Sequence, residues 1–158
     1  MNSDLKKIAI IGLGYVGLPL AVEFGKTRKV IGFDISKTRV EQLNSGLDIT
    51  NECSLDELRA AQMLNYTSSI DEISDAQIYI VTVPTPIDNV NRPDLSPLKL
   101  ASKSVGGVLK RGDIVIFEST VFPGATEEIC VPILEKESGL QFNKDFVWLQ
   151  PRADQSWR

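Results

Sequence analysis

The stretch "IAIIGLGYVGLPLAVEFG", residues 8–25, places three glycines between an apolar run and an amphipathic run. Gly12, Gly14 and Gly17 have the spacing G-x-G-x-x-G. After a strand, the first glycine permits a tight turn, the second lets the backbone approach a pyrophosphate, and the third lets helix and strand pack closely. The helix that follows then directs its N-terminus at the anion. The stretch predicts a dinucleotide-binding turn, with a tight turn that binds nothing as the alternative.

The next apolar run favours the first interpretation. "KVIGFD" ends at Asp34, 20 positions after Gly14. A carboxylate there accepts hydrogen bonds from the ribose hydroxyls of an adenosine and repels the extra phosphate of NADP, so NAD is the predicted cofactor. NADP is the alternative, because Lys37 and Arg39 follow closely and would neutralise a 2′-phosphate, unless they only form the solvated first turn of a helix.

Apolar runs and amphipathic stretches alternate along the whole chain. Apolar runs that separate helices are typical of strands buried on both faces of a parallel sheet. We therefore predict an α/β, doubly wound (Rossmann) fold with a mostly parallel sheet and helices on both faces. Strands are expected within 6–11, 29–33, 76–83, 113–119 and 145–150, and helices within 16–26, 37–46, 55–64, 98–112 and 126–139.

Boundary residues support these helices. Gly46, Gly112 and Gly139 stand where helices should stop, and Ser54 with Glu57 forms a capping box. The segment "PTPIDNVNRPDLSP", residues 84–97, contains four prolines and directly follows a predicted strand. Ligands of open α/β sheets bind beyond the carboxyl ends of strands, so this loop is a predicted binding element.

Composition narrows the function further. The chain has 158 residues, 42% of them hydrophobic, and a net charge of −4 without a basic block, so one domain and no nucleic-acid partner are expected. No apolar run approaches the roughly 20 residues of a membrane span, and the polar start argues against a signal peptide, so a cytoplasmic location is expected. With no histidine, and with Cys53 and Cys130 far apart, no metal site is predicted.

Several motifs together are more specific than the glycine spacing: "GLGYVGLPLA", "VPTPID", "RPDLSPL", "ESTVFPGATEE" and "VPILEKESGL". With these motifs, residues 7–146 resemble the UDP-glucose/GDP-mannose dehydrogenase family, and especially its UDP-N-acetylhexosamine 6-dehydrogenase branch. The resemblance implies an oxidoreductase that converts the 6-hydroxymethyl group of a UDP-sugar to a carboxylate in two NAD-dependent steps. Such enzymes supply precursors of capsule and surface polysaccharides and are homo-oligomers.

The resemblance also implies roles for individual residues. Thr120 would help to hold a catalytic water near the nicotinamide, a task that suits a hydroxyl able to donate and accept. Glu118, Glu127 and Glu128 are interpreted as helix-start and surface acids rather than as a catalytic pair. The residues implied to bind the cofactor are Gly12, Gly14, Tyr15, Val16 and Gly17 in the pyrophosphate loop, Asp34 and Arg39 at the adenosine ribose, Pro84 and Thr85 along the cofactor, and Ser119 and Thr120.

The family's cysteine nucleophile, with its lysine and asparagine, belongs to a region beyond the first domain, and neither Cys53 nor Cys130 matches it. Residues 148–158, "WLQPRADQSWR", depart from the family's "GYSPERINPGD". A DNA sequence with permitted codons for this tail also encodes "GYSPERINPG" when it is read one base later. We therefore expect an NAD-binding domain at 1–147, a frameshifted tail at 148–158 that frays beyond Trp148, and no sugar-nucleotide-binding domain.

Two other functions stay open from the sequence. A free-standing NAD-binding module without catalysis would need the same glycine loop and acidic residue. A 3-hydroxyacid dehydrogenase would share the loop, but it would not explain "RPDLSPL" or "ESTVFPGATEE". A truncated cofactor domain would by itself be inactive toward a UDP-sugar, because it carries no nucleophile.

Overall fold

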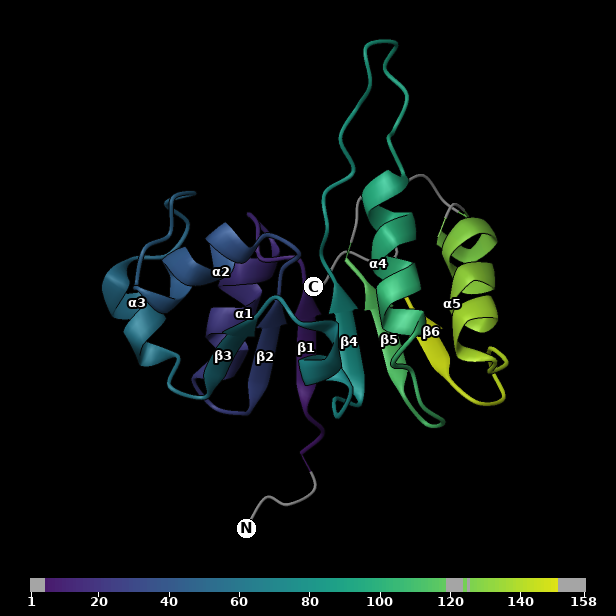
Figure 1. Cartoon of the computed structure of the whole chain (residues 1–158), viewed down its shortest axis with the longest axis horizontal. Helices are drawn as coiled ribbons and strands as arrows, with labels where there is room; N and C mark the ends of the chain where they lie inside the picture. The colour runs from purple at the N-terminus through teal and green to yellow at the C-terminus, as the bar shows by residue number, and fades with distance from the viewer. Residues whose placement is uncertain (1–4, 119–123, 125, 151–158) are drawn as a thin grey trace, which may run out of the picture.

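The computed structural model describes residues 5–118, 124 and 126–150. Its centre is one six-stranded sheet in the order β3-β2-β1-β4-β5-β6 (Figure 1). Every neighbouring pair of these strands is parallel, which confirms the predicted doubly wound sheet. The strands are β1 (Ile8–Ile11), β2 (Val30–Phe33), β3 (Leu64–Thr67), β4 (Ile78–Val81), β5 (Ile114–Phe117) and β6 (Val147–Leu149).

Helices cover both faces of the sheet, as predicted. One face packs against α1 (Gly17–Gly25), α2 (Lys37–Asn44) and α3 (Leu55–Ala60). The other face packs against α4 (Ser96–Gly106) and α5 (Val131–Ser138), which Figure 1 shows in front of β4, β5 and β6. A 3-10 helix (Ile70–Ile73) precedes β4, and a π-helix (Thr126–Cys130) leads into α5.

Strand β1 shows why the apolar runs are continuous. Ile8 and Ile10 lie in the cluster that contains Leu18 of α1, whereas Ala9 and Ile11 lie in the cluster that contains Leu98 of α4. Alternate residues thus face opposite layers, and both layers exclude water.

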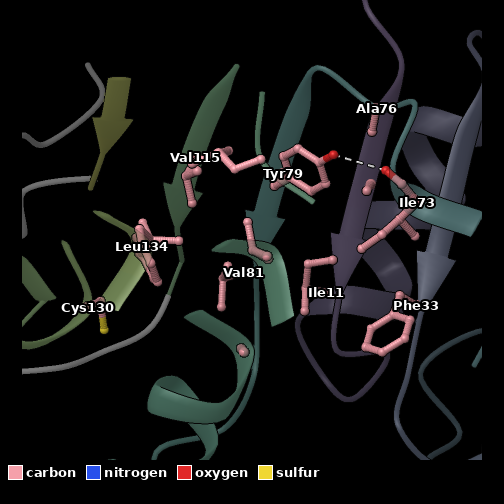
Figure 2. Close-up of a cluster of buried hydrophobic side chains, with 14 of the residues drawn as sticks. Ile11, Phe33, Ile73, Ala76, Tyr79, Val81, Val115, Cys130 and Leu134 are labelled. Atoms are coloured by element: carbon pink, nitrogen blue, oxygen red, sulfur yellow. Dashed lines mark hydrogen bonds between the residues drawn. The ribbon is translucent and has the colours of Figure 1, made fainter. Parts of the chain in front are cut away.

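The cluster on the α4 side contains one large polar side chain (Figure 2). The buried Tyr79 hydroxyl donates a hydrogen bond of 3.0 Å to the Ile73 carbonyl oxygen. A phenol buried in an apolar core needs such a partner, because an unpaired hydroxyl there is costly. This bond fixes the 3-10 helix against the sheet.

Among helix ends, the largest differences from the sequence prediction are at α3 and α4, which end several residues earlier than expected. The helix expected through residue 64 ends at Ala60, and Leu64 begins β3 instead. Hydrogen bonding to β2 explains the earlier end, because the Met63 carbonyl oxygen accepts a hydrogen bond from the Val30 amide. The next four residues then pair with β2 as strand β3. The capping box of Ser54 and Glu57 at the start of α3 is confirmed.

The helix expected to end at Gly112 ends at Gly106. Gly112, at φ +88°, instead serves the turn that enters β5, where Asp113 accepts a 2.8 Å hydrogen bond from the Lys110 amide. A side chain therefore closes this turn, and the apolar residues that follow α4 pack without continuing the helix.

Strand β6 extends through Leu149, two residues beyond the expected domain boundary at Val147. Trp148 packs edge-to-face against Phe117, with ring centroids 6.3 Å apart, so β6 is held to the core by an aromatic contact. Residues 151–158, the rest of the expected tail, lie outside the described residues. Among the helices that the structure describes, none has the length and apolar character needed to cross a bilayer.

Candidate functional site

A cleft of about 730 Å³ lies where β1, β2 and β4 end. Carboxyl ends of neighbouring parallel strands, on either side of the point where chain order reverses, are the usual ligand position in such sheets. The lining includes five of the residues predicted to bind a cofactor: Gly12, Gly14, Asp34, Arg39 and Pro84.

The three glycine positions of the loop differ in why they favour glycine. Gly12 has φ +99°, a conformation that favours glycine, and a Cβ there would lie 3.1 Å from the Val83 amide nitrogen. A Cβ on Gly17 would collide with the Gly12 carbonyl oxygen and with Thr82 Oγ1. Gly14 has no such constraint, because nothing lies within 4 Å of the position of its Cβ. Gly12 and Gly17 therefore serve the fold, and Gly14 leaves an open cradle in the cleft.

Both neighbouring strands hold the loop in place. From the β2 side, the Phe33 carbonyl accepts a 2.8 Å hydrogen bond from the Gly12 amide. From the β4 side, the buried Thr82 hydroxyl lies 2.7 Å from the Gly12 carbonyl oxygen and 3.0 Å from that of Ile11. Sequence reasoning missed Thr82, for which the only signal was a hydroxyl at the end of the apolar run "IYIV".

Asp34 stands at the end of β2 and faces the glycine loop. Its Oδ2 accepts a 2.9 Å hydrogen bond from the Leu13 amide, and its Oδ1 accepts one of 2.9 Å from the Ser36 amide. Each carboxylate oxygen retains further acceptor capacity, and an ionised carboxylate has no proton to donate. Asp34 is thus an oriented acceptor, suited to hydroxyl donors and repulsive to a phosphate.

Arg39 lies in the first turn of α2 and is buried, so the solvated alternative is wrong for this residue, whereas Lys37 is exposed. Arg39 Nε donates to the Leu13 carbonyl oxygen at 2.9 Å. That carbonyl shares a peptide unit with the Gly14 amide, and in a trans peptide the two bonds point in opposite directions. Arg39 therefore fixes the direction of the Gly14 N–H.

Arg39 is itself held by Asp48, which sequence reasoning also missed. Its Nη1 donates to Asp48 Oδ1 at 2.8 Å, and the Asp48 side chain is fully buried. Burial opposes ionisation of Asp48, but hydrogen bonds from Thr50, the Cys53 amide and Arg39 outweigh burial and hold the pKa of this carboxyl well below its usual range. No motif marks Asp48 in the sequence, because its partners are brought to it by the fold.

The opposite side of the cleft mixes apolar residues with polar ones, among them Asp94, Ser96 and Ser104. Pro84 follows β4, and Pro97, Leu100 and Ala101 line the cleft from α4. Loop 84–97 projects as a hairpin beyond the strands (Figure 1), with an Ile87–Pro93 bridge. The cleft wall at Pro84 is therefore the base of a braced hairpin.

Other predicted residues do not line this cleft. Tyr15 and Val16 are exposed outside it, at 69% and 54%, and Thr85 is absent from its lining. Ser119 and Thr120 lie outside the described residues. Their roles therefore stay predictions.

No nucleophile is formed by the cysteines. Cys53 and Cys130 are buried free thiols, and burial raises the pKa of each, which favours the unreactive protonated form. Glu118, Glu127 and Glu128 are exposed. Within residues 5–118, 124 and 126–150, no three acidic, cysteine or histidine side chains gather as metal ligands.

A parallel sheet that reverses its order beside a glycine turn, with an acidic residue ending the next strand, defines a dinucleotide-binding domain of the Rossmann class. Residues 6–151 match the profile described as "UDP-glucose/GDP-mannose dehydrogenase family, NAD binding domain". The chain therefore belongs to the UDP-glucose/GDP-mannose dehydrogenase family and carries its NAD-binding domain, with NAD as cofactor.

Individual relatives agree with this assignment. A UDP-N-acetyl-D-glucosamine 6-dehydrogenase of Salmonella typhi is 59% identical over 90% of this chain and 34% of its own length. Protein CapL of Staphylococcus aureus is 52% identical over 89% of this chain and 33% of its own length. A solved NDP-N-acetyl-D-galactosaminuronic acid dehydrogenase from Methanosarcina mazei, 32% identical, superposes with a TM-score of 0.83 over 96% of this chain and 35% of that chain. The chain thus spans about a third of the length of the relatives it matches.

Proposed function

We propose that this chain is the cofactor domain of an enzyme that oxidises the 6-hydroxymethyl group of a UDP-N-acetylhexosamine to the carboxylate. Conversion of an alcohol to an acid removes two hydrides, so two NAD molecules are reduced and one water supplies the second oxygen. The Salmonella typhi relative supports the substrate class, because it is 59% identical here and its name specifies UDP-N-acetyl-D-glucosamine.

One observation carries the cofactor half of this proposal. The open space at Gly14 lies in the same cleft as the oriented carboxylate of Asp34. A pyrophosphate fits against a backbone without a side chain, and ribose hydroxyls donate to a carboxylate. We assign the pyrophosphate to the loop of Gly12, Gly14 and Gly17 and the adenosine ribose to Asp34, with Pro84 against the cofactor.

Other roles in this proposal rest on the family resemblance alone. Tyr15 and Val16 would complete the pyrophosphate loop, and Thr85 would extend the wall that begins at Pro84. Ser119 and Thr120 would stand near the nicotinamide, with Thr120 orienting a water. When bound, NAD supplies the hydride acceptor for both oxidation steps.

A domain exchange tests the substrate. Residues 1–147 replace the N-terminal third of the Salmonella typhi relative, and NADH formation from UDP-N-acetylglucosamine is followed by absorbance. We expect turnover. The same exchange protein with Asp34→Ala should need a higher NAD concentration to reach half of its maximal rate. A folded exchange protein that binds NAD but forms no NADH would contradict the proposed substrate.

The 158-residue chain by itself should form no NADH from UDP-N-acetylglucosamine. NADH formation by that chain, lost in Thr120→Ala, would show that it is catalytic.

The domain boundary is a separate proposal. We infer that residues 148–158 are read in a shifted frame, because permitted codons exist for this tail that encode the family's "GYSPERINPG" when they are read one base later. Sequencing of the locus tests this inference directly. An open second frame that encodes a sugar-nucleotide-binding domain would support it, and its absence would favour a free-standing NAD-binding module.

A further inference from the structure

Arg39 and Asp48 form an unusual ion pair for this molecule. Their side chains are 10% and 0% exposed. In every other ion pair of the described residues, at least one side chain is 48% exposed or more. Surface pairs contribute little, whereas a buried pair fixes both partners because either charge alone is costly there. The chain therefore maintains a fixed arginine beside its cofactor cleft.

All three guanidinium nitrogens of Arg39 have acceptors within the protein. Nε donates to the Leu13 carbonyl, Nη1 donates to Asp48, and Nη2 lies 3.5 Å from Thr50 Oγ1. The Thr50 hydroxyl in turn donates to Asp48 Oδ1 at 2.6 Å. Asp48 thus both orients the guanidinium and compensates its charge.

Position makes this compensation relevant to cofactor choice. Arg39 and Asp34 line the same cleft and bind the same residue. Arg39 donates to the Leu13 carbonyl oxygen, and Asp34 accepts from the Leu13 amide. A 2′-phosphate on a ribose at Asp34 would therefore lie near an arginine, the residue type that accommodates this phosphate in NADP-binding sites. A free Arg39 would offset the repulsion from Asp34, and an Arg39 paired with Asp48 does not.

We propose that Asp48 determines the preference for NAD over NADP by holding and neutralising Arg39. Asp34 repels the 2′-phosphate, and Asp48 neutralises Arg39, the cation that lines the cleft and would counter this repulsion. Asp48 touches neither cofactor directly and acts as a positioning residue. The inference rests on the proposed ribose site at Asp34.

The test is the ratio of NAD to NADP affinity, measured by calorimetry on the 158-residue chain. Asp48→Asn keeps the size of the side chain and removes its charge. We expect NADP affinity to rise about ten- to a hundredfold relative to NAD, the range of one charge-assisted hydrogen bond. Adding Arg39→Met to Asp48→Asn should abolish this gain. An unchanged ratio in folded Asp48→Asn would overturn the proposal.

Asp113→Asn is the matched control. Asp113 is also a buried carboxylate in an ion pair, with Lys110, but it precedes β5 and so lies at the end of the sheet opposite the cleft. This variant should leave the NAD to NADP ratio within about twofold of the native value. A change as large as that in Asp48→Asn would mean that general loss of stability, not Arg39, alters cofactor choice, and would also overturn the proposal.

A second variant covers the case in which Asp48→Asn does not fold. Replacing both partners, Asp48→Leu with Arg39→Met, avoids an unpaired buried charge. If Arg39 is neutralised in the native chain, this pair should keep the native ratio. A further fall in relative NADP affinity would show that Arg39 already attracts the phosphate and would overturn the inference. Failure of the native chain to bind NAD would instead refute the proposed cofactor site.

Discussion

The two halves of the sheet build opposite sides of one cleft from different chemistry. The half with β1, β2 and β3 supplies charged groups, Asp34 and Arg39, each held by hydrogen bonds. The half with β4, β5 and β6 supplies a wall in which the apolar Leu100 and Ala101 lie beside the polar Asp94 and Ser96, and none of its described lining residues is a cation. We infer that discrimination between cofactors resides in the first half, which supplies both Asp34 and the buried Arg39, and that the second half mainly contributes contact area.

Two buried aspartates, one in each half, differ in the same way. Asp48 pairs with a buried arginine, whereas Asp113 pairs with Lys110, whose side chain is 48% exposed. When Asp48 is removed, the charge of Arg39 stays in a buried place, but Lys110 can turn to water. The same residue type at similar burial therefore carries different weight in the two halves.

The largest expected effect follows from that contrast. Asp48→Ala should lower the free energy of unfolding by about 3–5 kcal/mol, because it leaves an uncompensated buried charge. Asp113→Ala should cost about 1–2 kcal/mol, because it removes the acceptor of the Lys110 amide. Urea unfolding followed by circular dichroism measures both. Equal losses would remove the distinction between the two halves.

The glycines give the next effect. Gly17→Ala should cost about 3 kcal/mol, because its methyl group collides with the Gly12 carbonyl and Thr82 and the turn must move. Gly14→Ala should leave thermal stability almost unchanged and weaken NAD binding, because its methyl group enters open space in the cleft. Thermal unfolding together with calorimetry separates the two. Native NAD affinity in Gly14→Ala would show that the cradle at Gly14 is not used.

Loss of the proposed ribose acceptor, Asp34, should weaken cofactor binding. Asp34→Ala should weaken NAD binding by about 1.5–3 kcal/mol, the value of hydrogen bonds to a charged group. Native Asp34 should also make NAD bind more tightly than NADP. Calorimetry with both cofactors decides the matter, and equal affinity of the native chain for the two would argue against a ribose role for Asp34.

The smallest expected effect is on acid sensitivity. The pKa of Asp48 is lowered in the folded chain, so its ionised form stabilises the fold above about pH 4, the range of an unfolded aspartate, and this stabilisation is lost as the pH falls further. Asp48→Asn lacks this contribution, so its free energy of unfolding should change less between pH 5 and pH 3 than that of the native chain. Parallel urea curves at the two pH values provide the measurement, and identical pH dependence in the two proteins would contradict it.

Sequence patterns predicted the scaffold better than the contacts that complete the site. The apolar runs predicted five strands, of which β1, β2 and β4 are buried along almost their whole length, but β3, "LNYT", was missed because only its ends, Leu64 and Thr67, are buried. Gly14 and Asp34 were predicted from their spacing, which is local along the chain. Thr82 and Asp48 were not predicted. Thr82 hydrogen-bonds to Gly12, 70 positions away in the chain, and Asp48 pairs with Arg39, which lies on another element.

The hydrogen bonds of Asp34 have a consequence for the course of binding. Its carboxylate is already fastened to the Leu13 and Ser36 amides, and Arg39 already fixes the next peptide. Little conformational entropy then remains to be lost at the proposed adenosine end of the cleft, so more of the interaction free energy should appear as affinity. Association should be a single step without a slow rearrangement of this end, and differences between cofactors should appear mainly in how long each stays bound.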